Sequence, residues 1–530
     1  MASNYGQYFG GNTDTTAQTV PVFGKNQVEN SAGGFVFEIN DWKRLDRFLV
    51  LGCEGGSYYA SEQKLTVENA ESILRLLVSD GSKVVERILE VSLAGRAPKN
   101  DPALFALALA VGKGDDKTRS LALEALPQVA RIGTHLFTFL EYVQAFRGWG
   151  RGLRKGIANW YTSKTPDTLA YQLSKYRQRN GWSHKDALRL SHPVAPSEAH
   201  NALFKFVTKD VLTDDLPSQI LDFAILQKAT SVGEAIEVLS GNKSLTWEMV
   251  PTEFLGSPEV WEALLPNMLP TAILRNLGRM TANGLLAPLN EGTYLATGKL
   301  TDVNALRKAK VHPLSVLVAL KTYEQGHGEK GKLSWSPIQT ITDALNEAFY
   351  LSFGAIEPTG KRTLLALDVS GSMSSGQVAG MTGITPRIGS AAMSLVTAAV
   401  EKHHHIMGFT HGLVPLKISP KQRLDQVVKT ISNLNFGGTD CSLPMVWAKT
   451  NKVPVDTFVV YTDNETWAGA VHPFQALKQY RQAMGIPAKL VVVGMTATEF
   501  SIADPSDAGM LDVVGFDTAA PNVISDFARE

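Results

Sequence analysis

The sequence predicts a chain in two parts, a long array of α-helices followed by a doubly wound α/β domain. From Phe35 to about Ser352, apolar residues recur at helical spacing in segments separated by short turns rich in Gly, Pro, Asn and Asp. After residues 357–362 the pattern changes to continuous apolar runs that alternate with helical stretches, which is typical of buried parallel strands. A chain of 530 residues is long enough for more than one hydrophobic core.

The helical part is predicted to form one domain over residues 31–360. Helices repeated over such a length indicate stacked helical hairpins, although no clean sequence period is present. A single globular α domain is the alternative, but domains of this size rarely share one core. Residues 1–30 are rich in Asn, Gly, Thr, Ser and Gln and predict a flexible arm. The expected helices are 41–51, 66–79, 82–93, 102–111, 117–130, 134–146, 150–162, 199–207, 218–226, 258–265, 270–281, 313–325 and 337–350.

The α/β domain is predicted to occupy residues 361–530. Its expected strands are Thr363–Asp368, Thr457–Asp463 and Lys489–Gly494, with helical stretches between them. In a parallel sheet of this kind, functional residues lie at the carboxyl ends of the strands. Asp368 and Asp463 stand at two of those ends, so this edge of the sheet is the expected site of the domain's chemistry.

Composition excludes several classes of protein. The chain has 51 basic and 51 acidic residues, so any nucleic-acid site must be a local patch. Cys53 and Cys441 are isolated, which argues against a disulfide framework, a zinc site and secretion. We find no signal peptide and no apolar run of 18 residues, so we expect a cytoplasmic protein without a membrane partner.

Five oxygen-bearing side chains at the strand ends predict a metal site. Asp368, Ser370 and Ser372 alternate in one loop after a strand, Thr439 lies in a Gly-Gly-Thr-Asp loop, and Asp463 ends another strand. An all-oxygen set without His or Cys suits Mg²⁺ or another hard divalent cation. The alternative is that these side chains only cap their loops.

A basic stretch in the helical part predicts a surface that binds the phosphate backbone of a nucleic acid. Between Arg147 and His192 there are ten Lys or Arg residues against two acids, interleaved with Trp and Tyr. Cations of this density neutralise a phosphate backbone, and the aromatic rings can stack on bases. A merely solvated helix face is the alternative on charge alone. The candidate contacts in this stretch are Arg151, Arg154, Lys155, Lys175, Arg177, Arg179, Lys185 and His192.

The stretch is expected to be helical throughout. Thr165 is predicted to cap a helix that closes at Asn180-Gly181, and a second helix is expected over 183–192. Lys175 and Arg179, four residues apart, would then share one face and present two donors to one phosphate backbone.

Ordered motifs in both parts carry a family resemblance. They are Trp42–Leu49, Thr134–Phe139, Gln178–His184, Leu188–His192, Leu274–Asn283, Gly437–Ser442, Tyr461–Glu465 and Ile502–Pro505. Through them the sequence resembles a bacterial member of the Ro ribonucleoprotein family, whose RNA-binding module is the TROVE domain. The five oxygen ligands resemble the metal-ion-dependent adhesion site of von Willebrand factor A domains.

The resemblance implies a ring of HEAT-like helical repeats closed by the A domain. In the family, single-stranded 3′ ends of misfolded or immature noncoding RNA, ribosomal RNA precursors included, enter the ring. A Y-class small RNA binds the basic outer surface, at motif positions that match Lys175, Arg179 and His192. Bacterial relatives are linked through Y RNA to a 3′-to-5′ exoribonuclease. Residues in family motifs that the resemblance places in the ring interior are Arg44, Arg47, His135 and Arg279.

Two other function classes are alternatives to a non-catalytic RNA-binding protein. A protein-binding module would use the metal site to capture an acidic partner, because such metals keep an open position. An enzyme using Mg²⁺ is disfavoured, because the five residues supply neither a nucleophile nor a general base.

Overall fold

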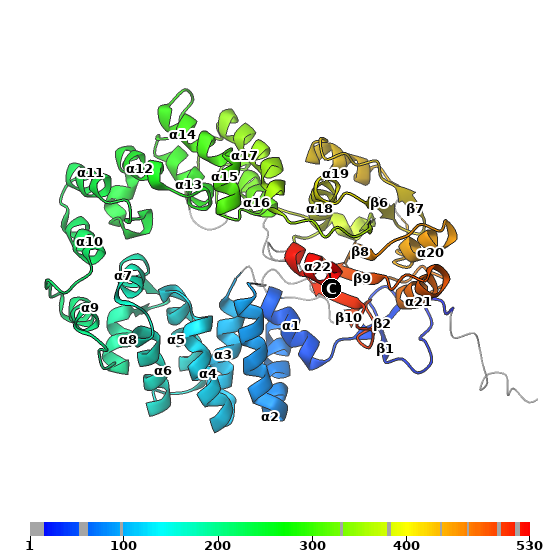
Figure 1. Ribbon diagram of the computed structural model, residues 1–530, viewed down its shortest axis with the longest axis horizontal. Helices are drawn as coiled ribbons and strands as arrows, with labels where there is room; N and C mark the ends of the chain where they lie inside the picture. Colours follow the sequence, from blue (N-terminus) through cyan, green and yellow to red (C-terminus); the bar gives the residue numbers. More distant parts are fainter. Residues whose placement is uncertain are drawn as a thin grey trace, which may run out of the picture. The chain divides into compact units, whose positions relative to one another are not determined.

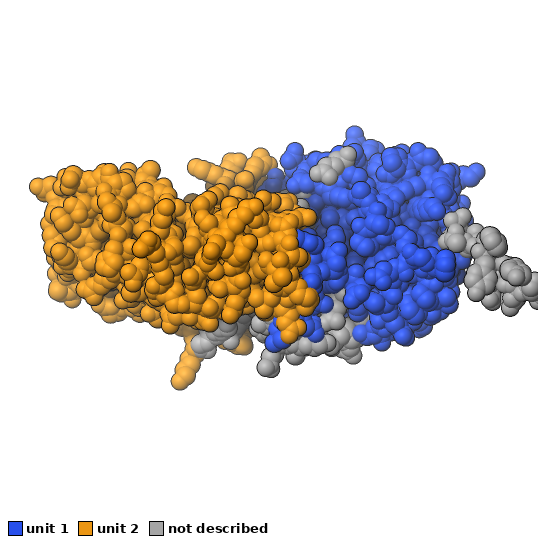
Figure 2. Space-filling view, turned by 90° about the horizontal axis from the view of Figure 1, so that it is seen from below, with its two compact units in different colours: residues 1–69, 312–318, 353–530 blue, residues 70–311, 319–352 orange. Residues whose placement is uncertain are grey.

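The structure is a computed structural model that describes residues 15–51, 62–95, 99–328, 332–378, 383–434, 437–463, 466–495, 500–514 and 520–529. The chain divides into two compact units, coloured separately in Figure 2. One is helical, with residues 70–311 and 319–352, and the other contains the α/β domain, with residues 1–69, 312–318 and 353–530. None of the helices described is long and apolar enough to cross a membrane. Cys53 lies outside the described residues.

The helical unit is built from consecutive helices that pack on neighbours close along the chain (Figure 1). α3 packs on α4 and α5, α4 on α6, α6 on α8, and the same pattern continues through α10, α11 and α12. This confirms the predicted helical region. Its helices are α2 (Glu62–Leu93), α3 (Asp101–Lys113), α4 (Asp116–Val129), α5 (Gly133–Phe146), α6 (Arg151–Thr162), α7 (Pro166–Lys175), α8 (His184–Ser191), α9 (Glu198–Lys209), α10 (Ser218–Lys228), α11 (Val232–Gly241), α12 (Pro258–Leu264), α13 (Pro270–Ala282), α14 (Glu291–Leu300), α15 (Val303–Lys308), α16 (Pro313–Glu324) and α17 (Gln339–Leu351).

Local chemistry sets the bounds of these helices. Thr165 caps α7 by accepting a hydrogen bond from the backbone of Thr168, as the sequence predicts. Asp80 has non-helical backbone angles (φ −158°, ψ 73°) inside α2, so the two helices expected over 66–79 and 82–93 are joined across a kink.

The α/β unit contains a six-stranded sheet in the order β11-β9-β8-β5-β6-β7. All neighbouring pairs are parallel except β6 with the edge strand β7. The predicted strands and the mostly parallel sheet are therefore confirmed. The strands are β5 (Thr363–Asp368), β6 (His404–Phe409), β7 (Leu413–Pro415), β8 (Thr457–Thr462), β9 (Lys489–Gly494) and β11 (Met510–Val514).

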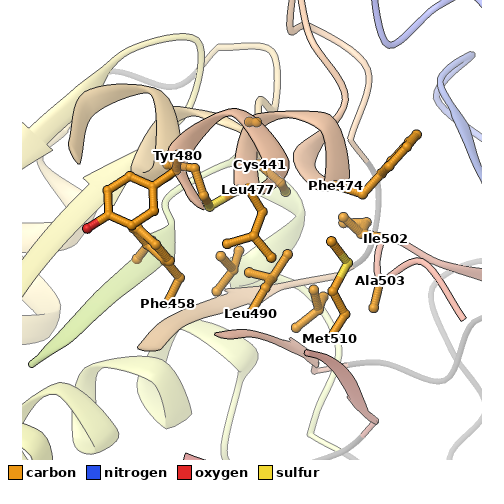
Figure 3. Close-up of a cluster of buried hydrophobic side chains, with 14 of the residues drawn as sticks. Cys441, Phe458, Phe474, Leu477, Tyr480, Leu490, Ile502, Ala503 and Met510 are labelled. Carbon is orange, nitrogen blue, oxygen red and sulfur yellow. The ribbon is translucent and has the colours of Figure 1, made fainter. Parts of the chain in front are cut away.

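Helices cover both faces of this sheet. On one face, Leu364 and Phe458 join a buried core with α20 and α21, part of which Figure 3 shows. On the other face, Leu365 and Val459 line a small cavity against α18 and α22. The strands are buried on both sides, which explains their continuous apolar sequences. The helices are α18 (Pro386–Val400), α19 (Leu424–Ser432), α20 (Leu443–Thr450), α21 (Pro473–Met484) and α22 (Ala520–Arg529).

Residues 15–38, which we call the N-terminal strap, pack on the α/β domain. β1 (Gln27–Glu29) and β2 (Phe35–Glu38) form a small antiparallel sheet with β10 (Phe500–Ser501), and α1 (Asp41–Leu51) follows. The strap contributes three buried side chains, Val22, Val36 and Phe37, to the core of the domain. The structure therefore differs from the expected flexible arm over residues 1–30: from residue 15 the chain is ordered, and residues 1–14 lie outside the described residues.

Candidate functional sites

Two of the predicted metal ligands end neighbouring strands at the carboxyl edge of the sheet. Asp368 is the last residue of β5, and Asp463 directly follows β8. β5 and β8 are adjacent and parallel, with Leu367 opposite Tyr461, so Asp368 and Asp463 end neighbouring strands at the same edge of the sheet. Asp368 is fully buried and Asp463 is 3% exposed. Burial, together with the negative charge of Asp463, raises the pKa of Asp368.

Several hydroxyl groups lie at this edge of the sheet, next to Asp368. Asp368 accepts hydrogen bonds from the backbone N–H of Ser370 (2.8 Å) and from the hydroxyl of Thr462 (2.9 Å). The hydroxyls of Ser370 and Ser372 are 3.0 Å apart. Nowhere in the described part of the chain do three or more His, Cys, Asp or Glu side chains gather as a metal site. A cation here would therefore depend on hydroxyl oxygens as well as the two carboxylates.

Thr439 lies in the loop that precedes α20, and the buried Asp440 lies in the same loop. The carbonyl oxygen of Thr439 accepts hydrogen bonds from the backbones of Trp467 and Ala468, both at 3.0 Å. This holds the loop against the chain that follows Asp463. The two buried carboxylates and the hydroxyls of Ser370 and Ser372 are all hard oxygen donors, a set that fits a divalent cation able to neutralise the carboxylates.

The basic stretch begins at the N-terminus of α6. Arg151, Arg154 and Lys155 lie in its first turns and are exposed, and the first turn contains no acid. Cations at this end of a helix oppose the helix dipole, so the arrangement costs stability unless an anion is present. A phosphate would be attracted by both the side chains and the free backbone N–H groups.

A β-hairpin replaces part of the expected helix. α7 ends at Lys175, and β3 (Gln178–Arg179) pairs with β4 (Trp182–Ser183). The turn between them is Asn180-Gly181, and both residues have positive φ (54° and 76°). Asn-Gly is the preferred pair for a two-residue hairpin turn of type I′, so the prediction of a helix C-cap there was wrong. Lys175 and Arg179 consequently do not share a helix face.

Lys175 is already engaged within the protein. Its ammonium donates to the hydroxyl of Tyr171 (2.8 Å) and pairs with Glu248 at 3.5 Å. Burial alone would lower the pKa of Lys175, but the bond to Tyr171 and the charge of Glu248 raise it. Among the residues that the structure describes, Lys175 is the one basic side chain between Arg147 and His192 that forms an ion pair.

The hairpin places a cation beside aromatic rings. Arg179 is exposed and lies directly opposite Trp182 in the pairing of β3 with β4, so both side chains project from the same face. The ring of Trp182 lies 5.8 Å from that of Trp149. Beside the hairpin is an open hollow of about 440 Å³ whose lining includes Trp182, Glu141 and Asp186. Its two carboxylates suit the amino groups of bases better than phosphates.

The remaining candidates lie in the same region. Arg177, Lys185 and His192 are exposed, and Arg177 bonds to Gln227. α8 begins with a capping box, in which Ser183 and Asp186 exchange hydrogen bonds, and His192 follows its last residue as the C-cap, with a left-handed φ of 48°.

The four residues that the family resemblance assigns to the ring interior differ in their surroundings. Arg47 pairs with Asp512 at 2.6 Å and its side chain is 10% exposed, so its charge is already engaged within the α/β unit. Arg44 pairs with Glu68 at 3.2 Å. His135 is half-buried, and burial, followed by the charges of Arg131 and Arg179, lowers its pKa to about 4. Arg279 is half-buried in the last turn of α13.

Sequence reasoning missed Arg387 and Gln18. The guanidinium of Arg387 donates to the carbonyls of Val369 (3.1 Å) and Ser370 (2.7 Å). These bonds fix the backbone of the loop that follows Asp368. Gln18 is fully buried and contacts the loop of Thr439 from the N-terminal strap. Neither lies in a motif, and the contacts join distant parts of the chain, so no local signal reveals them.

Comparison with known proteins matches both parts of the chain. The Ro60 vWA domain family matches residues 362–528, and the TROVE domain family matches residues 28–217 and 239–322. The curated RNA-binding protein RO60 of Deinococcus radiodurans is 46% identical over 509 residues, covering 95% of this chain and 96% of that protein. RNA-binding protein RO60 of Caenorhabditis elegans is 37% identical, covering 94% and 90%. The crystal structure of the Deinococcus radiodurans RO (RSR) protein aligns with a TM-score of 0.75 over 92% of this chain and 99% of that one.

Proposed function

Because this chain belongs to the Ro60 family of TROVE and vWA proteins, we propose that its helical unit is a non-catalytic RNA-binding surface. The observation that carries the proposal is the run of exposed cations on α6, the hairpin and α8, beside the Trp149–Trp182 pair. Backbone neutralisation and stacking need no particular base, so the surface should select RNA by structure more than by sequence. The curated relatives are named as RNA-binding proteins.

The first prediction concerns three cations that make no ion pair within the described protein. Changing Arg151, Arg154 and Arg179 together to Gln should weaken binding of an RNA helix with a single-stranded 3′ tail on the order of 100-fold near 0.1 M salt. The slope of log affinity against log salt should flatten by about three units, one for each phosphate that the protein no longer neutralises. Filter binding or fluorescence anisotropy across a salt series measures both.

The matched control is Lys417→Gln with Lys421→Gln, which removes two exposed cations from the α/β unit. This variant should bind RNA as the wild type does. An unchanged salt slope in the Arg151, Arg154 and Arg179 variant would contradict the proposed surface.

We further propose that the bound molecules are a Y-class small RNA on the basic surface and the 3′ ends of misfolded or precursor noncoding RNA, ribosomal RNA included. In this role the protein would present RNA to a 3′-to-5′ exoribonuclease for decay or maturation. Support comes from the family and from Arg179 and His192, which are exposed at the motif positions. Sequencing the RNA that copurifies with the untagged protein tests this; a discrete structured RNA is expected, and clean protein would contradict it.

The carboxyl edge of the vWA sheet is proposed to bind Mg²⁺ through Asp368, Ser370, Ser372, Thr439 and Asp463. A bound cation would neutralise the two buried carboxylates and keep a position open for an acidic ligand. Capture of an acidic protein there is the second candidate function. Exposed Trp467, beside the metal loop, would flank such a ligand.

The second prediction tests this metal site. In the wild type, Mg²⁺ at about 100 times its dissociation constant should add roughly 2.7 kcal/mol of stability, seen as a rise of several degrees in the melting temperature. Asp368→Asn should abolish the Mg²⁺-dependent rise, because it removes a ligand charge while keeping a side chain of the same shape. The control is Asp456→Asn, at the opposite end of β8, where the carboxylate pairs with Arg362. Asp456→Asn should lower the melting temperature but keep the Mg²⁺ response; a response retained in Asp368→Asn would refute the site.

A further inference from the structure

The N-terminal strap reaches the loops of the proposed metal site through two buried side chains, Asn30 and Gln18, and Gln18 is the one of these two that bonds to both loops. Gln18 is fully buried. Its side-chain amide donates to the carboxylate of Asp440 (2.8 Å) and to the carbonyl of Val471 (2.9 Å), and its carbonyl oxygen accepts from the hydroxyl of Thr466 (2.6 Å). The three partners lie in two loops: Asp440 in residues 437–442, and Thr466 and Val471 in residues 466–471.

Those two loops carry or flank proposed ligands. Residues 437–442 contain Thr439, and residues 466–471 follow shortly after Asp463. Asp440 also accepts from the backbone and hydroxyl of Ser442, so Gln18 joins an existing bond network rather than a free group. The hydroxyl of Thr466 in turn accepts from the backbone N–H of Cys441 at 3.1 Å.

The surrounding backbone is shaped to admit this side chain. A Cβ at Gly469 would lie 2.2 Å from the amide nitrogen of Gln18 and 2.4 Å from Asp440, so a larger residue there would exclude the glutamine. The strap backbone also approaches closely, because a Cβ at Gly34 would lie 1.9 Å from the carbonyl oxygen of Thr466. The backbone N–H of Gln18 donates to the carbonyl of Gly469 at 2.9 Å.

We propose that Gln18 is a positioning residue that cross-links the two loops around Thr439 and Asp463, so that the N-terminal strap completes the metal site. A buried amide bonded to both loops restrains their separation, and with it the position of Thr439 relative to the chain that follows Asp463. The effect of Gln18 on metal affinity rests on the Mg²⁺ binding proposed above, whereas the cross-link between the loops does not depend on a metal.

The test replaces Gln18 with Met, which keeps the length and apolar packing of the side chain but removes its three side-chain hydrogen bonds. The control is Gln27→Met in the same strap, because Gln27 bonds to Val22, Phe35 and His472 and to neither loop. Amide hydrogen exchange over 437–442 and 466–471 is followed in the full-length, metal-free protein. Mn²⁺ affinity is then measured by electron paramagnetic resonance.

Gln18→Met should exchange several-fold faster in both loops and bind Mn²⁺ about tenfold more weakly, as expected from the loss of buried hydrogen bonds. Gln27→Met should leave both readouts at the wild-type values. Exchange in the two loops that equals the wild type would overturn the inference, even if Mn²⁺ binds. Faster exchange in a protein whose wild type binds no Mn²⁺ would support the cross-link and refute the metal site instead.

Should Gln18→Met fail to fold, Gln18→Glu replaces it. Glutamate retains the acceptor for Thr466 but loses both donated bonds, so the loop of Asp440 should exchange faster than that of Thr466. Equal, wild-type exchange in both loops of this variant would also overturn the inference.

Discussion

Replacing Phe37 with alanine is expected to destabilise the vWA unit by about 3–5 kcal/mol. The side chain is 3% exposed in β2 and meets Phe474 of α21 edge-on, with ring centroids 5.2 Å apart. Its removal deletes buried apolar surface and leaves a cavity between the strap and α21, two costs that add. Amide exchange of β8 (Thr457–Thr462), deep in the same unit, measures the loss as a lowered opening free energy.

Phe23→Ala provides the matched control. Phe23 lies in the same strap, but its side chain is 96% exposed. Its replacement should therefore change stability by no more than about 0.5 kcal/mol. Similar, small effects of both substitutions would mean that the strap is not part of the folded core, and would support the flexible arm that composition predicts over residues 1–30.

The strap shows where sequence patterns mislead. Residues 1–30 contain few large apolar residues, and composition therefore predicts an arm without structure. The strap is nevertheless held by isolated contacts, such as the bond of Gln18 to Asp440, 422 positions away, and by the burial of Val22 in the core of the domain. Contacts of this kind have no period along the sequence. The strands of the sheet, in contrast, were predictable because burial on both faces forces continuous apolar runs.

The basic hairpin shows a second limit. Charge and aromatic content located the surface, but helical spacing assigned the wrong local structure to Asn180-Gly181. The same two residues satisfy a helix C-cap and a type I′ turn, because both need positive φ. Tertiary packing decides between them: β3 and β4 both lie against α5. The strand-end carboxylates Asp368 and Asp463 were placed correctly because sheet topology alone brings such ends together.

A buried histidine is expected to make the helical unit sensitive to acid. His184 is 3% exposed, with its Nδ1 atom 2.8 Å from the hydroxyl of Tyr161. Burial is the main cause that lowers its pKa to about 3, and the charge of Lys164 adds to this. The folded state therefore keeps His184 neutral, whereas the unfolded chain binds a proton below about pH 6.5. The stabilisation is complete above that pH and is lost as the pH falls towards 3.

Between pH 7.5 and 4.5, this one group should remove about 2–3 kcal/mol of stability. His184→Asn keeps a polar group near the hydroxyl of Tyr161 but cannot take up the proton, so its stability should fall less over the same range. Urea unfolding followed by far-ultraviolet circular dichroism, which the helices dominate, gives both profiles. His327→Asn changes an exposed histidine of the same unit and should reproduce the wild-type slope. Parallel profiles for wild type and His184→Asn would show that acid sensitivity arises at other groups, of which His135 and His312 also have a pKa lowered by burial to about 4.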